Sequence, residues 1–327
     1  MNARRLIFEN HGEPSKSLSL INFQTAALKD GEVLLEIHAA PINPADLNYI
    51  EGTYGIKPEL PSTVGMECSA TVLESSSATL SSGDLVFPIS QIGGWATHTV
   101  TSAENLIKLP SEIDHLQAAM LKVNPATAWL LLNHFEKLQK GDWVTLNASN
   151  SGVGQCVIQL AAAMGVKTAC FLRNETLAPE LTALGAELVL PDTAGGYEAA
   201  KLAIGKTKAK LAFNAVGGDS ALRLMKLLAH SGTHITYGAM GRKPLTVPNG
   251  PLIFGDLRIR GLWVTEWIKH ATRPEIEETY GHLARLILDG SLRQQVDSVH
   301  SLENFTTALG RLVASDRNGK VLFAKKS

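Results

Sequence analysis

The stretch 140–155 (KGDWVTLNASNSGVGQ) constrains the fold of this chain more than any other. Residues 143–146 are a short apolar run of strand-forming residues, and small turn residues occupy 147–151. From Val153 onward, apolar side chains recur with the period of a helix. A second apolar run follows at 166–172. The stretch therefore predicts a strand, a tight turn, a helix and a second strand parallel to the first.

The turn between this strand and helix is suited to bind an anion. Unpaired backbone N–H groups and the positive end of the helix dipole meet there and attract a pyrophosphate. Gly152 and Gly154 remove side chains that would keep the phosphate away. The dinucleotide-binding pattern G-x-G-x-x-G falls on Ser149, Ser151 and Gly154, so serine replaces two of its three glycines. An ordinary turn without a ligand is the alternative to a cofactor site.

The end of the second strand indicates which dinucleotide would bind. An NAD site needs an acidic residue about 20 positions after the turn, where its carboxylate holds the ribose 2′-OH. Arg173 occupies this region instead, 19 positions after Gly154, and Asn174 follows it. A guanidinium binds a 2′-phosphate through paired hydrogen bonds, so the sequence predicts NADPH. The alternative is a solvated surface arginine, and Glu175 places a negative charge beside the predicted site.

Hydrophobic patterning divides the chain into a β-rich part and a part in which helices and strands alternate. Residues 1–118 contain short apolar runs separated by Gly, Pro and Ser, which predict a β-rich domain. In residues 119–266, segments with the hydrophobic period of a strand alternate with segments that have the period of a helix, which predicts a doubly wound parallel sheet. Residues 267–327 end in a strand pattern that we expect to return to the first domain. The predicted class is α/β with two domains, a size that 327 residues allow.

Composition and charge exclude several classes of protein. A net charge of −1 provides no basic surface for nucleic acid or an anionic membrane. No run approaches the ~20 apolar residues that span a bilayer. Cys68, Cys156 and Cys170 stand apart, which argues against a disulfide framework and indicates a reducing compartment. The first residues enter a strand pattern almost directly and leave no room for a leader, so we expect a cytoplasmic protein.

Several segments together carry a family resemblance. They are APINPADLN (40–48), EGTYG (51–55), VNPATA (123–128), NASNSGVGQ (147–155), TYG (236–238) and GLWVTEW (261–267). With these segments the chain resembles, over nearly its full length, the zinc-free medium-chain dehydrogenase/reductase superfamily. Within that superfamily it is most similar to 2-enoyl thioester reductases of the mitochondrial trans-2-enoyl-CoA/enoyl-ACP reductase type. The resemblance implies a GroES-like substrate domain joined to a Rossmann domain.

The resemblance also implies which residues bind the cofactor and how the protein assembles. NADPH would be held by Asn124, Asn150, Ser151, Gly152, Val153, Arg173, Asn174, Tyr237, Gly238, Ala239, Met240, Leu262, Trp263, Val264 and Lys320. The substrate would be an acyl group carried by CoA or by acyl carrier protein. A homodimer formed mainly by the Rossmann domains is implied as well.

Candidate zinc ligands are missing where zinc-dependent relatives carry them. Met66 stands in place of a histidine, and no cysteine pair has ligand spacing, so we expect no metal. Without a metal, the acceptor must be activated by its own conjugation, which suits an α,β-unsaturated thioester. Hydride would go to Cβ and a proton to Cα. Tyr54, at the family's proton-donor position, is the candidate catalytic residue, because a neutral phenol can donate that proton.

Two other functions share this pattern. An NADPH:quinone oxidoreductase of the same superfamily has the same Asn-Pro-x-Asp and Gly-x-Tyr segments, and a protein can also bind NADPH as a ligand or sensor without turnover. A Tyr-x-x-x-Lys pair typical of short-chain dehydrogenases occurs at Tyr197 and Lys201. It follows the glycine turn too closely for that family, so we interpret both residues as the start of a surface helix.

Overall fold

The computed structural model describes residues 1–325, which form two compact units. The β-rich unit contains Met1–Val123 and the segment from Ala271 onward, and the parallel-sheet unit contains Asn124–His270. Each unit has its own hydrophobic core, as expected for separate domains. Within residues 1–325, every helix is too short or too polar to cross a membrane.

The parallel-sheet unit is built on a single sheet whose strands all run in the same direction. Its strands are β9 (Trp143–Leu146), β10 (Lys167–Leu172), β11 (Leu188–Pro191), β12 (Ala209–Asn214), β13 (Leu228–Thr236) and β14 (Arg258–Gly261). They lie in the order β11-β10-β9-β12-β13-β14. The strand order reverses between β9 and β12, which is where sheets of this type bind their ligands. The predicted doubly wound sheet is confirmed.

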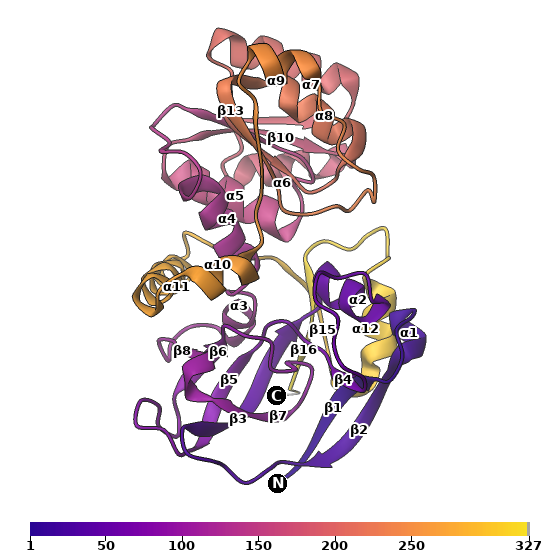
Figure 1. Cartoon of the computed structure of the whole chain (residues 1–327), viewed down its shortest axis with the longest axis vertical. Coiled ribbons are helices and arrows are strands. Elements are labelled where there is room, and N and C mark those ends of the chain that lie inside the picture. Colours follow the sequence, from indigo (N-terminus) through magenta and orange to yellow (C-terminus); the bar gives the residue numbers. More distant parts are fainter. Residues whose placement is uncertain (326–327) are drawn as a thin grey trace. The chain divides into compact units, whose positions relative to one another are not determined.

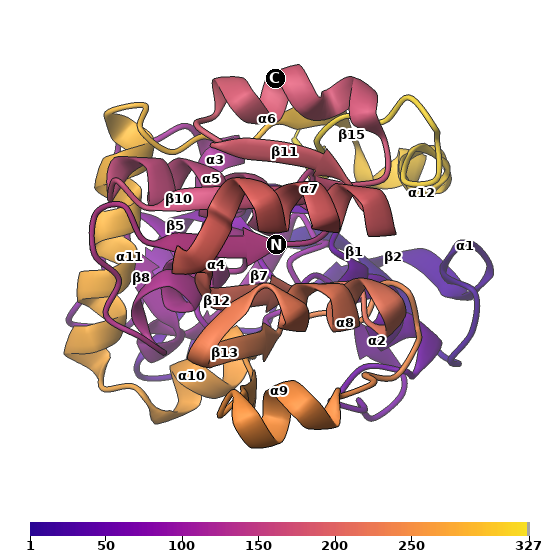
Figure 2. The same ribbon diagram turned by 90° about the horizontal axis from the view of Figure 1, so that it is seen from above.

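Helices cover both faces of this sheet. The helices of this unit are α4 (Asn124–Asn133), α5 (Gly152–Ala163), α6 (Ala178–Ala183), α7 (Ala194–Ile204), α8 (Gly218–Lys226), α9 (Asn249–Phe254) and α10 (Val264–His270), with short 3₁₀ turns η2 (Glu175–Leu177) and η3 (Gly205–Thr207). Figure 1 shows α4 and α5 on one face and α7 and α8 on the other. Figure 2 looks onto the face covered by α7 and α8. Because both faces are covered, every residue of β9 is buried, and its sequence is apolar without alternation.

Tyr197 and Lys201 both lie in helix α7, which has an exposed face as the sequence indicates, but the Tyr197 side chain is buried in the core of this unit. Its side chain is 5% exposed, its ring stacks on Phe171 with centroids 3.7 Å apart, and the Arg223 guanidinium lies 5.1 Å from it. The burial of Tyr197 follows from the position at which α7 begins. Thr193 caps α7, which places Tyr197 on the face that turns toward the sheet, while Lys201 remains exposed.

The β-rich unit contains two sheets. Its strands are β1 (Asn2–Phe8), β2 (Leu18–Gln24), β3 (Glu32–Pro41), β4 (Ser62–Thr63), β5 (Ser69–Ser75), β6 (Leu85–Pro88), β7 (His98–Ser102), β8 (Leu106–Lys108), β15 (Val296–His300) and β16 (Lys320–Ala324). One sheet has the order β2-β1-β4, and the other β15-β16-β3-β5-β6-β8, with β7 also paired to β3. The helices are α1 (Pro14–Ser17), α2 (Pro44–Glu51), α3 (His115–Ala119), α11 (Arg273–Leu288) and α12 (Phe305–Arg311), with η1 (Ala103–Asn105) and η4 (Leu302–Asn304).

The segment after Ala271 completes the β-rich unit. Strand β16 pairs antiparallel with β3, and the ring of its Phe323 meets Trp95 edge to face with centroids 5.1 Å apart. Gln117 and Gln294 exchange two hydrogen bonds, of 2.8 Å and 2.9 Å, between side chain and backbone. These contacts join residues that are far apart in the sequence into one core.

His234 makes the stability of the parallel-sheet unit depend on pH. It is fully buried in β13, and within residues 1–325 neither ring nitrogen has a hydrogen-bond partner. Burial lowers the pKa of His234 to about 4. The unfolded chain, whose histidine titrates near ~6.5, therefore binds more protons between these values, and stability falls as pH falls through this window. We expect His234→Leu to remove this dependence, which is worth on the order of 3 kcal/mol.

Denaturant unfolding at pH 4.5 to 7.5 measures this effect. The matched control is His230→Leu, because His230 is exposed at the same strand. Wild type and the control should lose stability more steeply than His234→Leu on acidification. Equal slopes for all three proteins would contradict the assignment.

Candidate functional site

The start of helix α5 has free hydrogen-bond donors, as the sequence predicts for an anion site. Ser151 caps the helix, and its hydroxyl accepts a hydrogen bond of 3.2 Å from the N–H of Gly154. Within the described chain, the N–H groups of Gly152 and Val153 meet no acceptor. Asn150 is exposed immediately before the cap. An anion placed here would satisfy these donors and would also be attracted by the helix dipole.

Gly154 and Ser149 have a different role from the one predicted. A Cβ added to Gly154 would lie 2.5 Å from the Ser149 carbonyl oxygen, so glycine is required for the helix to approach the turn rather than for a ligand to approach the helix. Ser149 is fully buried, and its hydroxyl lies 3.0 Å from the carbonyl oxygens of both Leu146 and Phe171. The serine thus ties β9 to β10 where the usual fingerprint has a glycine.

A buried network of amide, hydroxyl and carboxylate groups connects the carboxyl ends of the strands. The Asn147 amide donates to Asn214 at 2.9 Å and to Ser220 at 2.8 Å, and its carbonyl oxygen accepts from the N–H of Ala215. The Asn214 side chain reaches Thr236 at 3.1 Å. The Ser220 hydroxyl donates to Asp192 at 2.7 Å. The ends of β9, β12, β13 and β11 are therefore fixed relative to one another.

Arg173 and Asn174 directly follow β10, at the same edge of the sheet as the turn. Both are exposed, and no acidic side chain among residues 1–325 pairs with Arg173. The Asn174 side-chain oxygen accepts hydrogen bonds from the N–H and the hydroxyl of Thr176, at 3.2 Å and 2.7 Å. These bonds turn the chain away from the strand and leave the guanidinium in solvent, where a phosphate can reach it.

Residues 237–240 follow β13 and lie beside the turn. Burial raises the pKa of Tyr237, and the Ser151 hydroxyl beside it acts in the opposite direction, so these two predicted residues are neighbours. Gly238 packs against Ala215, where an added Cβ would come within 3.3 Å of the carbonyl oxygen. Ala239 and Met240 are exposed.

The remaining predicted cofactor residues of this unit lie at the end of β14 and the start of α4. The N–H of Leu262 donates to Thr236 at 3.0 Å, which joins residues 262–264 to the end of β13. The Trp263 ring lies 5.4 Å from the Lys269 ammonium, and Val264 is buried. Asn124 is buried at the first position of α4, which packs against α5.

Tyr54 and Lys320 belong to the β-rich unit. Tyr54 follows the end of α2, where Gly52 adopts a positive φ of 76°, and its N–H donates to Asn48 at 3.1 Å. Its half-buried ring meets Tyr49 edge to face with centroids 6.5 Å apart. Tyr49 is buried and belongs to the core of the β-rich unit. Lys320 is buried at the start of β16, and its ammonium donates to the Asn43 side-chain oxygen.

Two protein-family models match parts of this chain. The model for the alcohol dehydrogenase GroES-like domain matches residues 29–111, and that for zinc-binding dehydrogenases matches residues 152–281. The mitochondrial enoyl-[acyl-carrier-protein] reductase of Homo sapiens is 40% identical over 314 residues, which cover 94% of this chain and 84% of that protein. This chain belongs to the enoyl-[acyl-carrier-protein] reductase family. The resemblance and the predicted combination of GroES-like and Rossmann domains are confirmed.

Solved structures agree with membership of the enoyl reductase family. The mitochondrial 2-enoyl thioester reductase of Candida tropicalis, seen as an Etr1p/Etr2p heterodimer and as Etr1p with NADP and crotonyl-CoA, matches with a TM-score of 0.90 and 27% identity. Those matches cover 99% of this chain and 100% of the other. A quinone oxidoreductase of Pseudomonas syringae matches with a TM-score of 0.87 over 99% of this chain and 100% of that chain. At 22% identity, that match shows the shared fold alone.

This enoyl reductase contains a buried cluster of ionisable groups that the sequence reasoning did not predict. Asp46 accepts hydrogen bonds of 2.8 Å from the N–H groups of Asn43 and Met66, and burial raises the pKa of Asp46 to about 7. Glu67 accepts from the Asn43 amide at 2.7 Å and from the N–H of Val123 at 2.9 Å. The sequence signal was the spacing of Asn43 and Asp46, which is that of a capping box at the start of α2.

Lys122 and Lys320 balance the charge of these two carboxyl groups. The Lys122 ammonium donates to the Met66 carbonyl oxygen at 2.7 Å, and burial lowers the pKa of Lys122 to about 8. Although one matching model is named for zinc, residues 1–325 contain no group of three or more His, Cys, Asp or Glu side chains able to hold a metal. The two lysines therefore place positive charge beside the buried carboxyl groups of Asp46 and Glu67.

Proposed function

We propose that this protein reduces 2-enoyl thioesters with NADPH. The observation that supports this most strongly is the 40% identity to the human enoyl-[acyl-carrier-protein] reductase. The match covers 94% of this chain, which includes the Tyr54 segment and the cofactor turn. Etr1p, which has the same fold, binds NADP and crotonyl-CoA together. The acyl group would be presented as a thioester of CoA or of acyl carrier protein, as in fatty acid metabolism. The thioester carbonyl is common to both carriers.

The carboxyl edge of the parallel sheet fits NADPH. The free N–H groups of Gly152 and Val153 suit the diphosphate, and the unpaired guanidinium of Arg173 suits the 2′-phosphate. Tyr237 and Leu262 directly follow the neighbouring strands β13 and β14, at positions that would bind the nicotinamide half. When bound, NADPH supplies the hydride that reduces the substrate.

Tyr54 would donate the proton that completes the reduction at Cα. Its hydroxyl is carried by the loop that follows Gly52 at the end of α2, and its ring meets the buried ring of Tyr49 edge to face. A neutral phenol is a suitable general acid for a carbanionic centre at neutral pH. We propose that the enzyme works without zinc, with the substrate's own conjugation providing the activation.

The protein is further proposed to be a homodimer joined through its parallel-sheet units. Strand β14 is the edge of its sheet, and most of its residues are exposed. Just before it, α9 exposes Ile253 by 68% and Phe254 by 83%. Unpaired edges and exposed apolar groups of this kind are typical of protein contacts.

Sedimentation measures this assembly. Wild type should sediment as a dimer and Phe254→Asp as a monomer, because a buried carboxylate opposes association. The matched control is Val313→Asp, since Val313 is an equally exposed apolar residue of the β-rich unit and should leave the dimer intact. A monomeric wild type would contradict the proposal.

Removal of the Tyr54 hydroxyl tests the proposed reaction. With crotonyl-CoA as substrate, Tyr54→Phe should lower kcat by roughly 10²-fold to 10³-fold, the range for loss of a general acid, and should leave NADPH affinity unchanged. Tyr49→Phe is the matched control, because it removes a neighbouring hydroxyl that bonds to Ser62 at 3.2 Å. Full activity of Tyr54→Phe would exclude its role. A wild type that reduces quinones but not crotonyl-CoA would overturn the proposed function.

Removal of the Arg173 charge tests the cofactor. We expect Arg173→Ala to raise the KM for NADPH roughly 10-fold to 100-fold, because a hydrogen-bonded phosphate contact is worth about 1.5–3 kcal/mol. The KM for NADH should stay nearly constant and serves as the internal control. Equal changes for both cofactors would contradict recognition of the 2′-phosphate by Arg173.

A further inference from the structure

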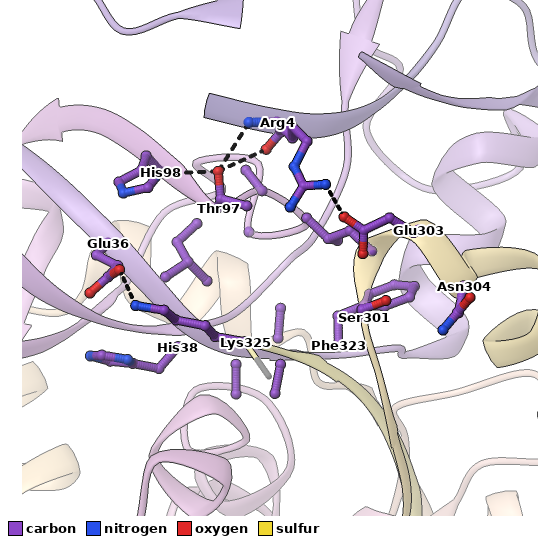
Figure 3. A pocket seen from close by; sticks show the side chains of 17 residues that line it. Arg4, Glu36, His38, Thr97, His98, Ser301, Glu303, Asn304, Phe323 and Lys325 are labelled. Atoms are coloured by element: carbon purple, nitrogen blue, oxygen red, sulfur yellow. Dashed lines mark hydrogen bonds and ion pairs between the residues drawn. The ribbon is translucent and has the colours of Figure 1, made fainter. Parts of the chain in front are cut away.

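A cavity of about 510 Å³ lies in the β-rich unit, at a fork between two strands. Along one edge, β3 pairs with β7 as far as Glu36, opposite His98, and then with β16 from Ala39, opposite Ala324. Strands β7 and β16 diverge between Glu36 and Ala39 of β3. Figure 3 shows the resulting space, which we call the strand-fork cavity, with side chains from β1, β3, η4 and β16 around it. None of the predicted catalytic or cofactor residues lines it.

The floor of the strand-fork cavity is apolar. Ile37, Ala39 and Ala40 of β3, Leu302 of η4 and Phe323 of β16 line it, and each is at most 9% exposed. The backbone at the fork already has its hydrogen bonds. The N–H of residue 37 donates to residue 97 at 2.9 Å, and that of residue 325 donates to residue 38 at 3.0 Å. The floor therefore favours a hydrocarbon group and requires no polar atom from a ligand.

Two ion pairs form the rim of the strand-fork cavity. Arg4 pairs with Glu303, and Lys325 pairs with Glu36 at 2.6 Å. Figure 3 shows the two pairs on opposite sides of the space. Their side chains are between 23% and 62% exposed, and partly solvated pairs of this kind contribute only about 0–1 kcal/mol. Each of these four charged side chains can therefore turn toward a charged group of a ligand at a small cost in free energy.

The charge of the rim selects the class of ligand. Its two cations and two anions sum to zero, and burial lowers the pKa of both His38 and His98, so these rings add no charge at neutral pH. A simple anion would meet Glu36 and Glu303 as well as the cations, and a simple cation would meet Arg4 and Lys325. A zwitterion can pair both of its charges and leave none of the four rim groups uncompensated.

We propose that the strand-fork cavity binds a small zwitterion with an apolar body, of the class of hydrophobic dipeptides. Its carboxylate would join Arg4 on one side of the cavity and its ammonium would join Glu36 on the other, and its side chains would cover the apolar floor. The site is separate from the proposed reaction, so its occupation does not require the enzyme to turn over.

Calorimetry with three matched probes tests this inference. L-leucyl-L-phenylalanine carries both charges, its N-acetyl form only the anion, and its C-terminal amide only the cation. We expect the zwitterion to bind about threefold to fivefold more tightly than either of the others, since pairing with a partly solvated group is worth up to about 1 kcal/mol. Arg4→Gln and Glu36→Gln should each weaken binding of the zwitterion by about threefold to fivefold and leave crotonyl-CoA reduction unchanged.

Lys201→Gln is the control for a general effect of charge, because Lys201 is an exposed cation of the other unit. Absence of binding by all three peptides at millimolar concentration would overturn the inference. Equal binding of the zwitterion and the N-acetyl peptide would also overturn it, because the cavity would then recognise an anion. Enoyl reduction is measured independently, so loss of one result leaves the other interpretable.

Discussion

A buried hydrogen-bond network at the carboxyl edge of the parallel sheet is the constraint on which the rest of the cofactor site depends. Asn147 is bonded to Asn214 and Ser220, and Ser220 to Asp192, so the strand ends around the point of reversed order share one set of polar groups. An unpaired amide in this buried position would cost about 1–3 kcal/mol, so each member fixes its neighbours. The turn before α5 and the segment after β13 are thereby held next to each other.

This arrangement explains how the turn works with serines in place of two glycines. The buried Ser149 hydroxyl lies against two backbone carbonyl oxygens and does not face a ligand. Ser151 caps α5 and leaves the N–H groups of Gly152 and Val153 available to an anion. The remaining glycine, Gly154, provides the close approach of helix to turn. The substitutions therefore add hydrogen bonds to the turn and preserve its free donors.

The sequence predicted the parallel sheet well, because strand and helix periods alternate clearly along residues 119–266. The sequence did not predict the environment of side chains that pack against distant elements. Tyr197 looked like a surface residue, but its burial follows from Phe171 and Arg223, which are distant in the chain. The partners of Asp46 likewise come from another segment. Local pattern predicts which segments are strands and which are helices, whereas burial of a polar side chain is decided by tertiary contacts.

A crystal structure of the protein with NADP⁺ tests the central claim most directly, because it locates each phosphate of the cofactor. The account predicts the diphosphate against the N–H groups of Gly152 and Val153, with the 2′-phosphate on the Arg173 guanidinium. An ordered cofactor whose diphosphate lies away from the start of α5 would contradict it.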